Sequence, residues 1–304
     1  MLTPEESSGH SRISSGPLSS GGLRVLAPAK LNLFFELISK RDDGYHNIST
    51  VMQTIDLFDE LLLRRGETGV ELESTGLDVP TEEGNLVWRA AKLFLRRFAP
   101  DIGVRIRLVK RIPLGAGLGG GSSDAAATLV GLDRLLDLGI DADEMRRIAA
   151  TLGSDVPFFI EGGTALCEGR GEVVTPAKSG ANLHFVLVRP PISVSTQEVY
   201  AHSKIGLTGP RREANILLSA LERGDIGGIG EAVFNRLECV TSAILPSLLE
   251  LKGIMAGLPF AGVCMTGSGS AFFGICRSRR EVKGAVASLR DRRVGRVYSA
   301  TGWL

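Results

Sequence analysis

The stretch that most restricts the fold of this chain is a glycine-rich segment between Pro113 and Asp124. It reads Pro113-Leu-Gly-Ala-Gly-Leu-Gly-Gly-Gly-Ser-Ser-Asp124, so five of the seven residues from Gly115 to Gly121 are glycine. Glycine adopts positive φ at little cost and lets a bulky group come close to the backbone. The segment therefore predicts a bare turn that a charged ligand can approach.

The residues after this turn predict a helix from Asp124 to Leu136, because the leucines from Leu129 onward recur at helical spacing. Ser122 or Ser123 is its predicted N-cap. A glycine turn that leads into a helix N-terminus predicts an anion site, since free N–H groups and the positive end of the helix dipole converge there. Phosphate is the simplest anion to expect.

Three other interpretations of this segment are weaker. A P-loop needs Lys after its last glycine, and Ser122 stands there instead. The dinucleotide pattern G-x-G-x-x-G fits residues 115–120, but a strand and an acidic residue should follow the helix. The chain instead continues with Asp141 and Glu144, whose spacing predicts the capping box of a second helix that Gly153 ends. A flexible linker would not lie between an apolar strand and an Ala-rich helix.

The glycine segment resembles the phosphate loop of the GHMP small-molecule kinases. Three further stretches carry the resemblance in the family's order: Ala27-Pro-Ala-Lys-Leu-Asn-Leu33 with Gly44-Tyr-His46, then Gly153-Ser-Asp-Val-Pro-Phe-Phe159, then Thr266-Gly-Ser-Gly-Ser-Ala271. The resemblance covers nearly everything after residue 20. It implies an α+β, two-domain GHMP kinase fold, with the active site in the cleft between a ribosomal-protein-S5-like N-terminal domain and a ferredoxin-like C-terminal domain.

The expected domain limits follow from this resemblance and from composition. Residues 1–20 are rich in Ser and Gly and predict a disordered tail. Residues 21–180 are expected to form the N-terminal ATP-binding domain and residues 181–304 the C-terminal domain. At 304 residues the chain is long enough for two such domains.

Lys30 and Asp155 are the two candidates for catalysis. Lys30 and Asn32 share one face of a strand predicted around residues 31–37, where a Lys among apolar neighbours either reaches water or meets an anion. The resemblance implies that Lys30 stabilises the transferred phosphoryl group and that Asn32 helps to hold the substrate. It also implies that Asp155 is the catalytic base, whereas a lone Asp near Pro is by itself more often a cap or a turn residue.

The resemblance assigns binding residues as well. The ATP-binding residues are Pro113, Leu114, Gly115, Ala116, Gly117, Leu118, Gly119, Gly120, Gly121, Ser122 and Ser123. Tyr45 and His46 are expected to contact a cytidine, although a turn Tyr at the core edge and a solvated His remain the alternative. Tyr200 is a candidate to stack on the cytosine, and a core position is its alternative.

The implied activity is ATP-dependent phosphorylation of the 2-hydroxyl of 4-diphosphocytidyl-2-C-methyl-D-erythritol, in non-mevalonate isoprenoid precursor biosynthesis. Mg²⁺ is expected with ATP, because a metal neutralises the phosphates in such reactions. Its protein ligands are not assigned, and Ser123 is a candidate by analogy only. Two alternatives stay open: a GHMP kinase for homoserine or a mevalonate derivative, and a non-catalytic nucleotide-binding protein on this fold.

Composition limits the remaining classes. A formal net charge of +1 gives no electrostatic argument for nucleic acid or an anionic membrane, and no apolar run approaches the roughly 18 residues of a membrane span. The four cysteines show no metal-site spacing, which favours reduced thiols and a cytoplasmic protein. The expected partner is a small-molecule substrate, and the sequence leaves a monomer and a homodimer equally open. The basic helix expected at residues 277–290 is interpreted as a solvated face, because no aromatic residues alternate with its charges.

Overall fold

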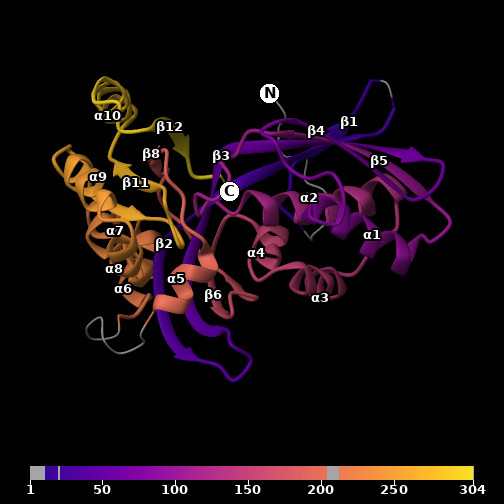
Figure 1. Ribbon diagram of the computed structural model, residues 1–304, viewed down its shortest axis with the longest axis horizontal. Helices are drawn as coiled ribbons and strands as arrows, with labels where there is room; N and C mark the ends of the chain where they lie inside the picture. The colour runs from indigo at the N-terminus through magenta and orange to yellow at the C-terminus, as the bar shows by residue number, and fades with distance from the viewer. Residues whose placement is uncertain (1–10, 20, 204–211, 304) are drawn as a thin grey trace. The chain divides into compact units, whose positions relative to one another are not determined.

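The computed structural model describes residues 11–19, 21–203 and 212–303 (Figure 1). The chain divides into two compact units that alternate along the sequence. Unit 1 contains the described residues up to Ala29, then Leu57–Ile112 and Gly119–Gly162. Unit 2 contains Lys30–Asp56, Pro113–Leu118 and the described residues from Gly163 onward. The predicted domain boundary near residue 180 remains a prediction.

Unit 1 combines β-sheet with four helices. Its strands are β1 (Ser15–Pro17), the first part of β2 (Leu23–Lys40), the second part of β3 (His46–Gly66), β4 (Val70–Gly76) and β5 (Gly103–Lys110). Its helices are α1 (Leu86–Phe98), α2 (Gly120–Leu136), α3 (Ala142–Leu152) and α4 (Val156–Glu161). β5 lies between β3, which is antiparallel to it, and β4, which is parallel. In Figure 1, α1 and α2 lie along one face of these strands.

Local sequence signals explain where the unit 1 helices start. The Asn85 side chain accepts a hydrogen bond from Val87 N and caps α1. The Asp141 side chain accepts from the first-turn N–H groups of α3, and Gly153 follows the last residue of that helix, as predicted. The leucine face of α2 is buried, with Leu129 fully buried. Capping and helical periodicity were therefore sufficient for α3 and for the body of α2.

The N-terminal segment differs from the expected disordered tail. Its first ten residues lie outside the described residues, but β1 pairs with the start of β2, and Ile13 is buried. The Arg134 guanidinium of α2 donates to Ile13 O at 2.6 Å and to Ser15 Oγ at 2.8 Å. Main-chain pairing and one half-buried Arg order a polar segment that composition alone assigned to disorder.

Unit 2 contains a second sheet and six helices among its described residues. Its strands are β6 (Thr164–Gly169), β7 (Val173–Pro176), β8 (His184–Arg189), β9 (Phe234–Asn235), β10 (Gly262–Met265), β11 (Phe272–Cys276) and β12 (Arg296–Thr301). Its helices are α5 (Thr196–His202), α6 (Asn215–Arg223), α7 (Ile226–Ala232), α8 (Arg236–Ile244), α9 (Ser247–Ala256) and α10 (Arg279–Asp291). The second sheet has the antiparallel order β10-β11-β8-β12.

The core of unit 2 joins this sheet to helices and to the first part of β3. Phe272, Val186 and Leu289 are fully buried members of one apolar cluster, which also takes Ile48 from β3. The hairpin of β6 and β7 pairs with the start of β3. The mixture of β-sheet and helices in both units agrees with the α+β part of the prediction.

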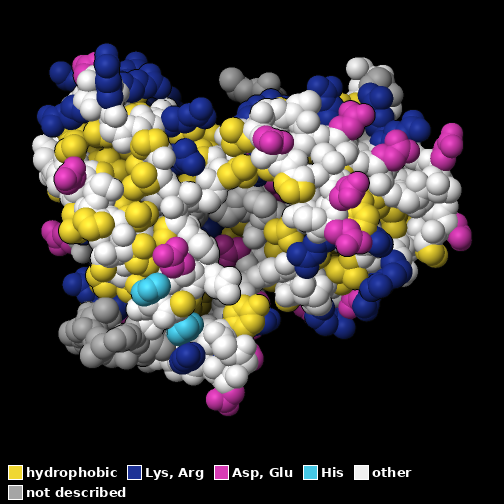
Figure 2. Space-filling view, in the orientation of Figure 1, with side chains coloured by type: hydrophobic (Ala, Val, Ile, Leu, Met, Phe, Trp, Pro, Cys, Tyr) yellow, Lys and Arg dark blue, Asp and Glu magenta, His cyan; other side chains and the backbone are white. Residues whose placement is uncertain are grey.

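Further findings concern the basic helix, strand β4 and the length of the helices. The basic helix is α10, and Figure 2 shows Lys and Arg side chains gathered on it. β4 was missed, because its side chains alternate between exposed and half-buried positions with no apolar face. Within the described parts of the chain, no helix is long and apolar enough to cross a bilayer.

Candidate active site

The glycine segment forms a turn whose close contacts exclude side chains. Gly117 has φ +75°, and a Cβ there would lie 2.1 Å from Thr266 O. The Thr266 hydroxyl donates to Gly117 O at 3.2 Å. Leu118 O accepts a hydrogen bond from Lys30 N at 3.0 Å. In unit 2, the predicted phosphate loop is therefore attached by its backbone to β2 and to the Thr266 turn.

In unit 1, α2 begins four residues earlier than predicted. Its N-cap is Gly119, which has φ +70° and makes no side-chain capping bond. Ser122 and Ser123 lie inside the first turn, so the prediction that either is the N-cap was wrong. A positive-φ glycine can end the turn where a serine would be strained, and it leaves first-turn N–H groups such as that of Gly120 without a capping side chain. This is the backbone arrangement that binds phosphate.

A buried charged cluster supports the start of α2, and sequence reasoning missed it. Lys110 donates to Asp59 and, at 2.7 Å, to Asp124 Oδ2. All three side chains are almost completely buried. A Cβ on Gly120 would lie 2.8 Å from Lys110 Nζ, so the helix start packs directly on the ammonium. The signal was present in β5, where Lys110 continues the alternating buried face of Val104.

The environment shifts the pKa values in this cluster. Burial raises the pKa of the Asp124 carboxyl well above its usual range, against the opposing charge of Lys110. Burial by itself would lower the pKa of Lys110, but the two carboxylates outweigh it and raise that pKa. Asp59 Oδ1 also accepts from the backbone N–H groups of Arg111 and Ile112, at 2.5 and 2.8 Å.

Lys30 and Asn32 lie together in unit 2, as their spacing predicted. Lys30 Nζ donates to Asn32 Oδ1, and both side chains are buried, so the alternative of a Lys that reaches water is wrong. Asn32 Nδ2 donates to Thr50 Oγ1 at 2.9 Å, and Asn32 N donates to Thr266 Oγ1 at 3.0 Å. Thr50 and Thr266 were not singled out for this role, because pairing between distant strands is not visible in a single sequence.

Asp155 belongs to unit 1 and stands immediately before α4. It occupies the N-cap position, but its side chain makes no capping hydrogen bond. The side chain is half-buried, in contrast to the fully buried helix residues Val156 and Phe158 that follow. The interpretation of Asp155 as a helix cap therefore lacks the expected capping hydrogen bond. Its role as the catalytic base stays a prediction.

The expected substrate-binding residues of unit 2 lie in two neighbouring segments. The rings of His46 and Tyr200 are 5.3 Å apart between centroids. His46 is buried, and this burial, followed by the charge of Lys40, lowers the pKa of its imidazole. Its buried ring excludes the alternative of a solvated His. Tyr45 is 54% exposed, and its ring lies 5.2 Å from the guanidinium carbon of Arg170.

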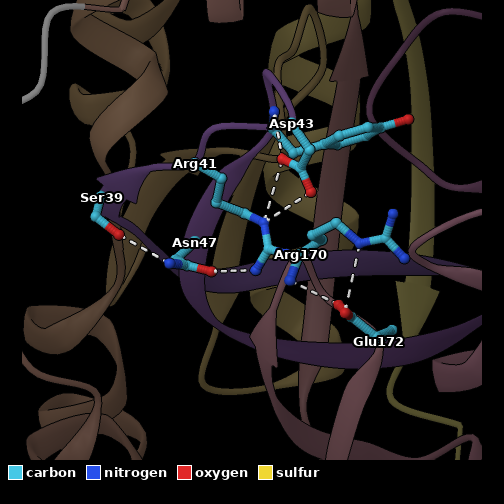
Figure 3. Close-up of polar contacts among 7 residues, drawn as sticks. Ser39, Arg41, Asp43, Asn47, Arg170 and Glu172 are labelled. Carbon is cyan, nitrogen blue, oxygen red and sulfur yellow. Dashed lines mark hydrogen bonds and ion pairs between the residues drawn. The ribbon is translucent and has the colours of Figure 1, made fainter.

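The loop that carries Tyr45 is held by polar side chains (Figure 3). Arg41 Nε donates to Asp43 Oδ2 at 3.0 Å, and Arg41 Nη1 donates to Asn47 Oδ1 at 3.0 Å. Asn47 Nδ2 in turn donates to Ser39 Oγ at 2.8 Å. These contacts close the turn between β2 and β3 and fix the backbone on either side of Tyr45.

Two buried oxygen atoms at the start of α2 are candidates to hold a metal. Ser123 Oγ and Asp124 Oδ1 are buried and have no hydrogen-bond partner among the described residues. Hydroxyl and carboxylate oxygens suit Mg²⁺, which keeps several waters and binds substrate phosphates through few protein ligands. In the described part of the chain, no cluster of three or more His, Cys, Asp or Glu side chains could hold a metal alone. These residues fit a Mg²⁺ ion that arrives with a phosphate ligand.

Comparison with known proteins agrees with this geometry. The family described as GHMP kinases N terminal domain matches residues 85–163, and GHMP kinases C terminal matches residues 217–294. The chain belongs to the GHMP kinase family. It is therefore a small-molecule kinase by family, and the expected fold class is confirmed.

Individual relatives narrow the comparison within the GHMP kinases. The chain is 41% identical to 4-diphosphocytidyl-2-C-methyl-D-erythritol kinase of Shouchella clausii, across 88% of this chain and 90% of that protein. A crystal structure of 4-(cytidine 5'-diphospho)-2C-methyl-D-erythritol kinase matches with a TM-score of 0.80 and 37% identity, covering 92% of this chain and all of that one. A crystal structure of homoserine kinase from Cytophaga hutchinsonii matches with a TM-score of 0.74, covering 92% of this chain and 94% of that one. Its sequence identity is 22%, so this match shows a shared fold and nothing more.

Proposed function

We propose that this GHMP kinase transfers the γ-phosphoryl group of ATP to the 2-hydroxyl of 4-diphosphocytidyl-2-C-methyl-D-erythritol, in non-mevalonate isoprenoid precursor biosynthesis. The observation that carries the proposal is the 41% identity to a relative of that name over nearly the whole chain. The homoserine kinase relative reaches only 22%, which makes another small alcohol the weaker candidate. The presence in this sequence of both Lys30 and Asp155 argues against a protein that only binds nucleotide.

The chain supplies what phosphoryl transfer requires, which is positioning and neutralised charge rather than covalent help. The backbone N–H groups from Gly119 to Ser122 bind the phosphates of ATP, whereas Ser123 N donates to Gly119 O at 2.9 Å inside the helix. Lys30, buried beside Asn32, stabilises the charge on the transferred phosphoryl group. The Asn32 amide is held by Thr50 and its backbone N by Thr266, so the Lys30 ammonium and the amide keep one defined arrangement.

Asp155 takes the proton of the 2-hydroxyl as its oxygen attacks the γ-phosphorus and the bond to the leaving ADP breaks. Tyr45, His46 and Tyr200 bind the cytidine, and the contact between the rings of His46 and Tyr200 supports a shared aromatic surface. Ser123 is the candidate protein ligand of Mg²⁺, which neutralises phosphate charge when bound. ATP is the phosphate donor in this proposal.

The experiment measures ADP release by the purified chain with ATP, Mg²⁺ and 4-diphosphocytidyl-2-C-methyl-D-erythritol, beside homoserine and mevalonate. Asp155→Asn is compared with Asp101→Asn, a matched change at an exposed position of the same unit. We expect turnover of the diphosphocytidyl alcohol alone, a loss of about 100-fold or more in Asp155→Asn, and retained ATP binding. Turnover of homoserine or mevalonate instead would refute the substrate, and full activity in Asp155→Asn would refute the base.

A further inference from the structure

The hairpin between β6 and β7 carries an Arg that the proposed reaction does not yet use. Arg170 lies between Gly169 and Gly171, which have φ +69° and +115°. Glu172 accepts hydrogen bonds from Arg170 N at 2.6 Å and from Arg170 Nε at 3.4 Å. A Cβ on Gly169 would lie 2.9 Å from Glu172 Oε2, so the glycine makes room for this contact. The hairpin therefore fixes the direction of the Arg170 side chain (Figure 3).

Strand register brings Arg170 beside Tyr45. β6 is antiparallel to β3 and pairs Gly169 with Ile48, so Arg170 stands across from Asn47, two residues from Tyr45. The guanidinium carbon of Arg170 lies 5.2 Å from the centre of the Tyr45 ring. A cation at this distance over an aromatic face is attracted by the ring's quadrupole.

The surroundings hold this contact in place. Tyr45 N donates to Asp43 Oδ1 at 3.0 Å, and Arg41 donates to the same carboxylate. That backbone hydrogen bond, with the charges of Arg41 and Arg170, lowers the pKa of Asp43. Arg170 therefore has Glu172 on one side and the Asp43–Tyr45 turn on the other, while Tyr45 itself stays half exposed.

We infer that Arg170 is a positioning residue for the alcohol substrate, because it holds the exposed Tyr45 ring as a ready platform for the cytosine. The inference rests on the proposed function, in which Tyr45 contacts the cytidine. Base stacking on an aromatic ring contributes binding energy, and a ring fixed before binding loses less conformational freedom when the base arrives. Arg170 thus affects the affinity for the cytidine part and leaves the transfer of the phosphoryl group unchanged.

The test is Arg170→Met, which keeps an apolar stem and removes the cation. We expect the KM for the diphosphocytidyl alcohol, and the Kd for cytidine diphosphate measured by calorimetry without ATP, to rise between about twofold and tenfold. The kcat and the KM for ATP should change less than about twofold, since only the base platform is altered. Arg170→Lys keeps a cation but lacks the planar guanidinium, so its KM and Kd values should lie between those of the wild type and those of Arg170→Met.

Arg105→Met is the matched control, because Arg105 forms an exposed ion pair with Glu71. In a Tyr45→Ala background, Arg170→Met should have no further effect on the Kd for cytidine diphosphate. Additive losses would overturn the inference, since Arg170 would then act other than through Tyr45. Unchanged KM and Kd values in folded, active Arg170→Met would also overturn it. Failure of the wild type to turn over the diphosphocytidyl alcohol would instead refute the proposed function.

Discussion

Removal of the ammonium beneath the start of α2 should destabilise unit 1 strongly. Lys110→Met keeps the length of the side chain but leaves Asp59 and Asp124 as two buried carboxylates without their cation. Removing one partner of a buried ion pair costs about 3–5 kcal/mol of unfolding free energy. Asp59 keeps two backbone N–H donors, whereas Asp124 Oδ1 already has no partner among the described residues, so Asp124 bears most of the loss.

The sign of the pH dependence follows from Asp124. Its pKa is raised in the folded state, mainly by burial, so its protonated form is favoured there. The stability from this group is complete below the unfolded pKa of about 3.9 and is lost as the pH rises through the folded pKa. Lys110 opposes that shift, so its removal raises the folded pKa further. The destabilisation of Lys110→Met should therefore be larger at pH 8 than at pH 5.

The assay is thermal unfolding at both pH values, beside Lys92→Met as a control. Lys92 forms an exposed ion pair with Glu83 at 3.6 Å, which is worth at most about 1 kcal/mol. We expect Lys110→Met to lower Tm at pH 8 by roughly 10 °C. The double variant Lys110→Met/Asp124→Leu should recover most of the loss, since apolar side chains can replace a buried ion pair. A loss no larger than that of Lys92→Met, or a larger loss at pH 5, would refute the reasoning.

Three further predictions concern single contacts. Gly117→Ala should reduce kcat/KM for ATP by at least about tenfold in steady-state assays. The reason is that the new Cβ would lie 2.1 Å from Thr266 O and that φ is +75° at this position. Unchanged ATP kinetics would contradict the assignment of this loop to phosphate binding. Thr266→Val should cost about 1–3 kcal/mol in chemical denaturation, because Asn32 N loses its acceptor, and a neutral result would mean that water replaces the hydroxyl. Native protein treated with iodoacetamide at pH 8 should be alkylated at the exposed Cys239 and not at Cys276, whose pKa is raised to about 12 chiefly by burial; mass spectrometry of the peptides checks this.

Sequence reasoning succeeded where one segment contains its own signal. The capping residue Asp141 and the stop at Gly153 define α3 locally, and the order of four motifs was enough for the family. The start of α2 was misplaced because Ser122 is the residue type that caps helices, whereas positive φ at Gly119 is a property of the folded turn.

The remaining errors and omissions in the sequence predictions concern contacts between residues that lie far apart in the sequence. The contacts of Lys110 with Asp59, and of Asn32 with Thr266, depend on strand register, which a single sequence does not reveal. The N-terminal segment was assigned to disorder because its composition is polar, yet Arg134 supplies the hydrogen bonds that order it. Exposed edge strands such as β4 lack an apolar face, so their pattern resembles a loop.

The alternation of the two units along the chain has a consequence for synthesis on the ribosome. The segment Lys30–Asp56 emerges early, yet it belongs to the unit completed by residues from Gly163 onward. Domains usually fold one after another as they leave the ribosome, but here the apolar strand around Phe35 waits for its partners in β8, β11 and α8. Neither unit corresponds to a continuous stretch that can be expressed alone, and a nascent chain released halfway would expose that strand to chaperones and proteases.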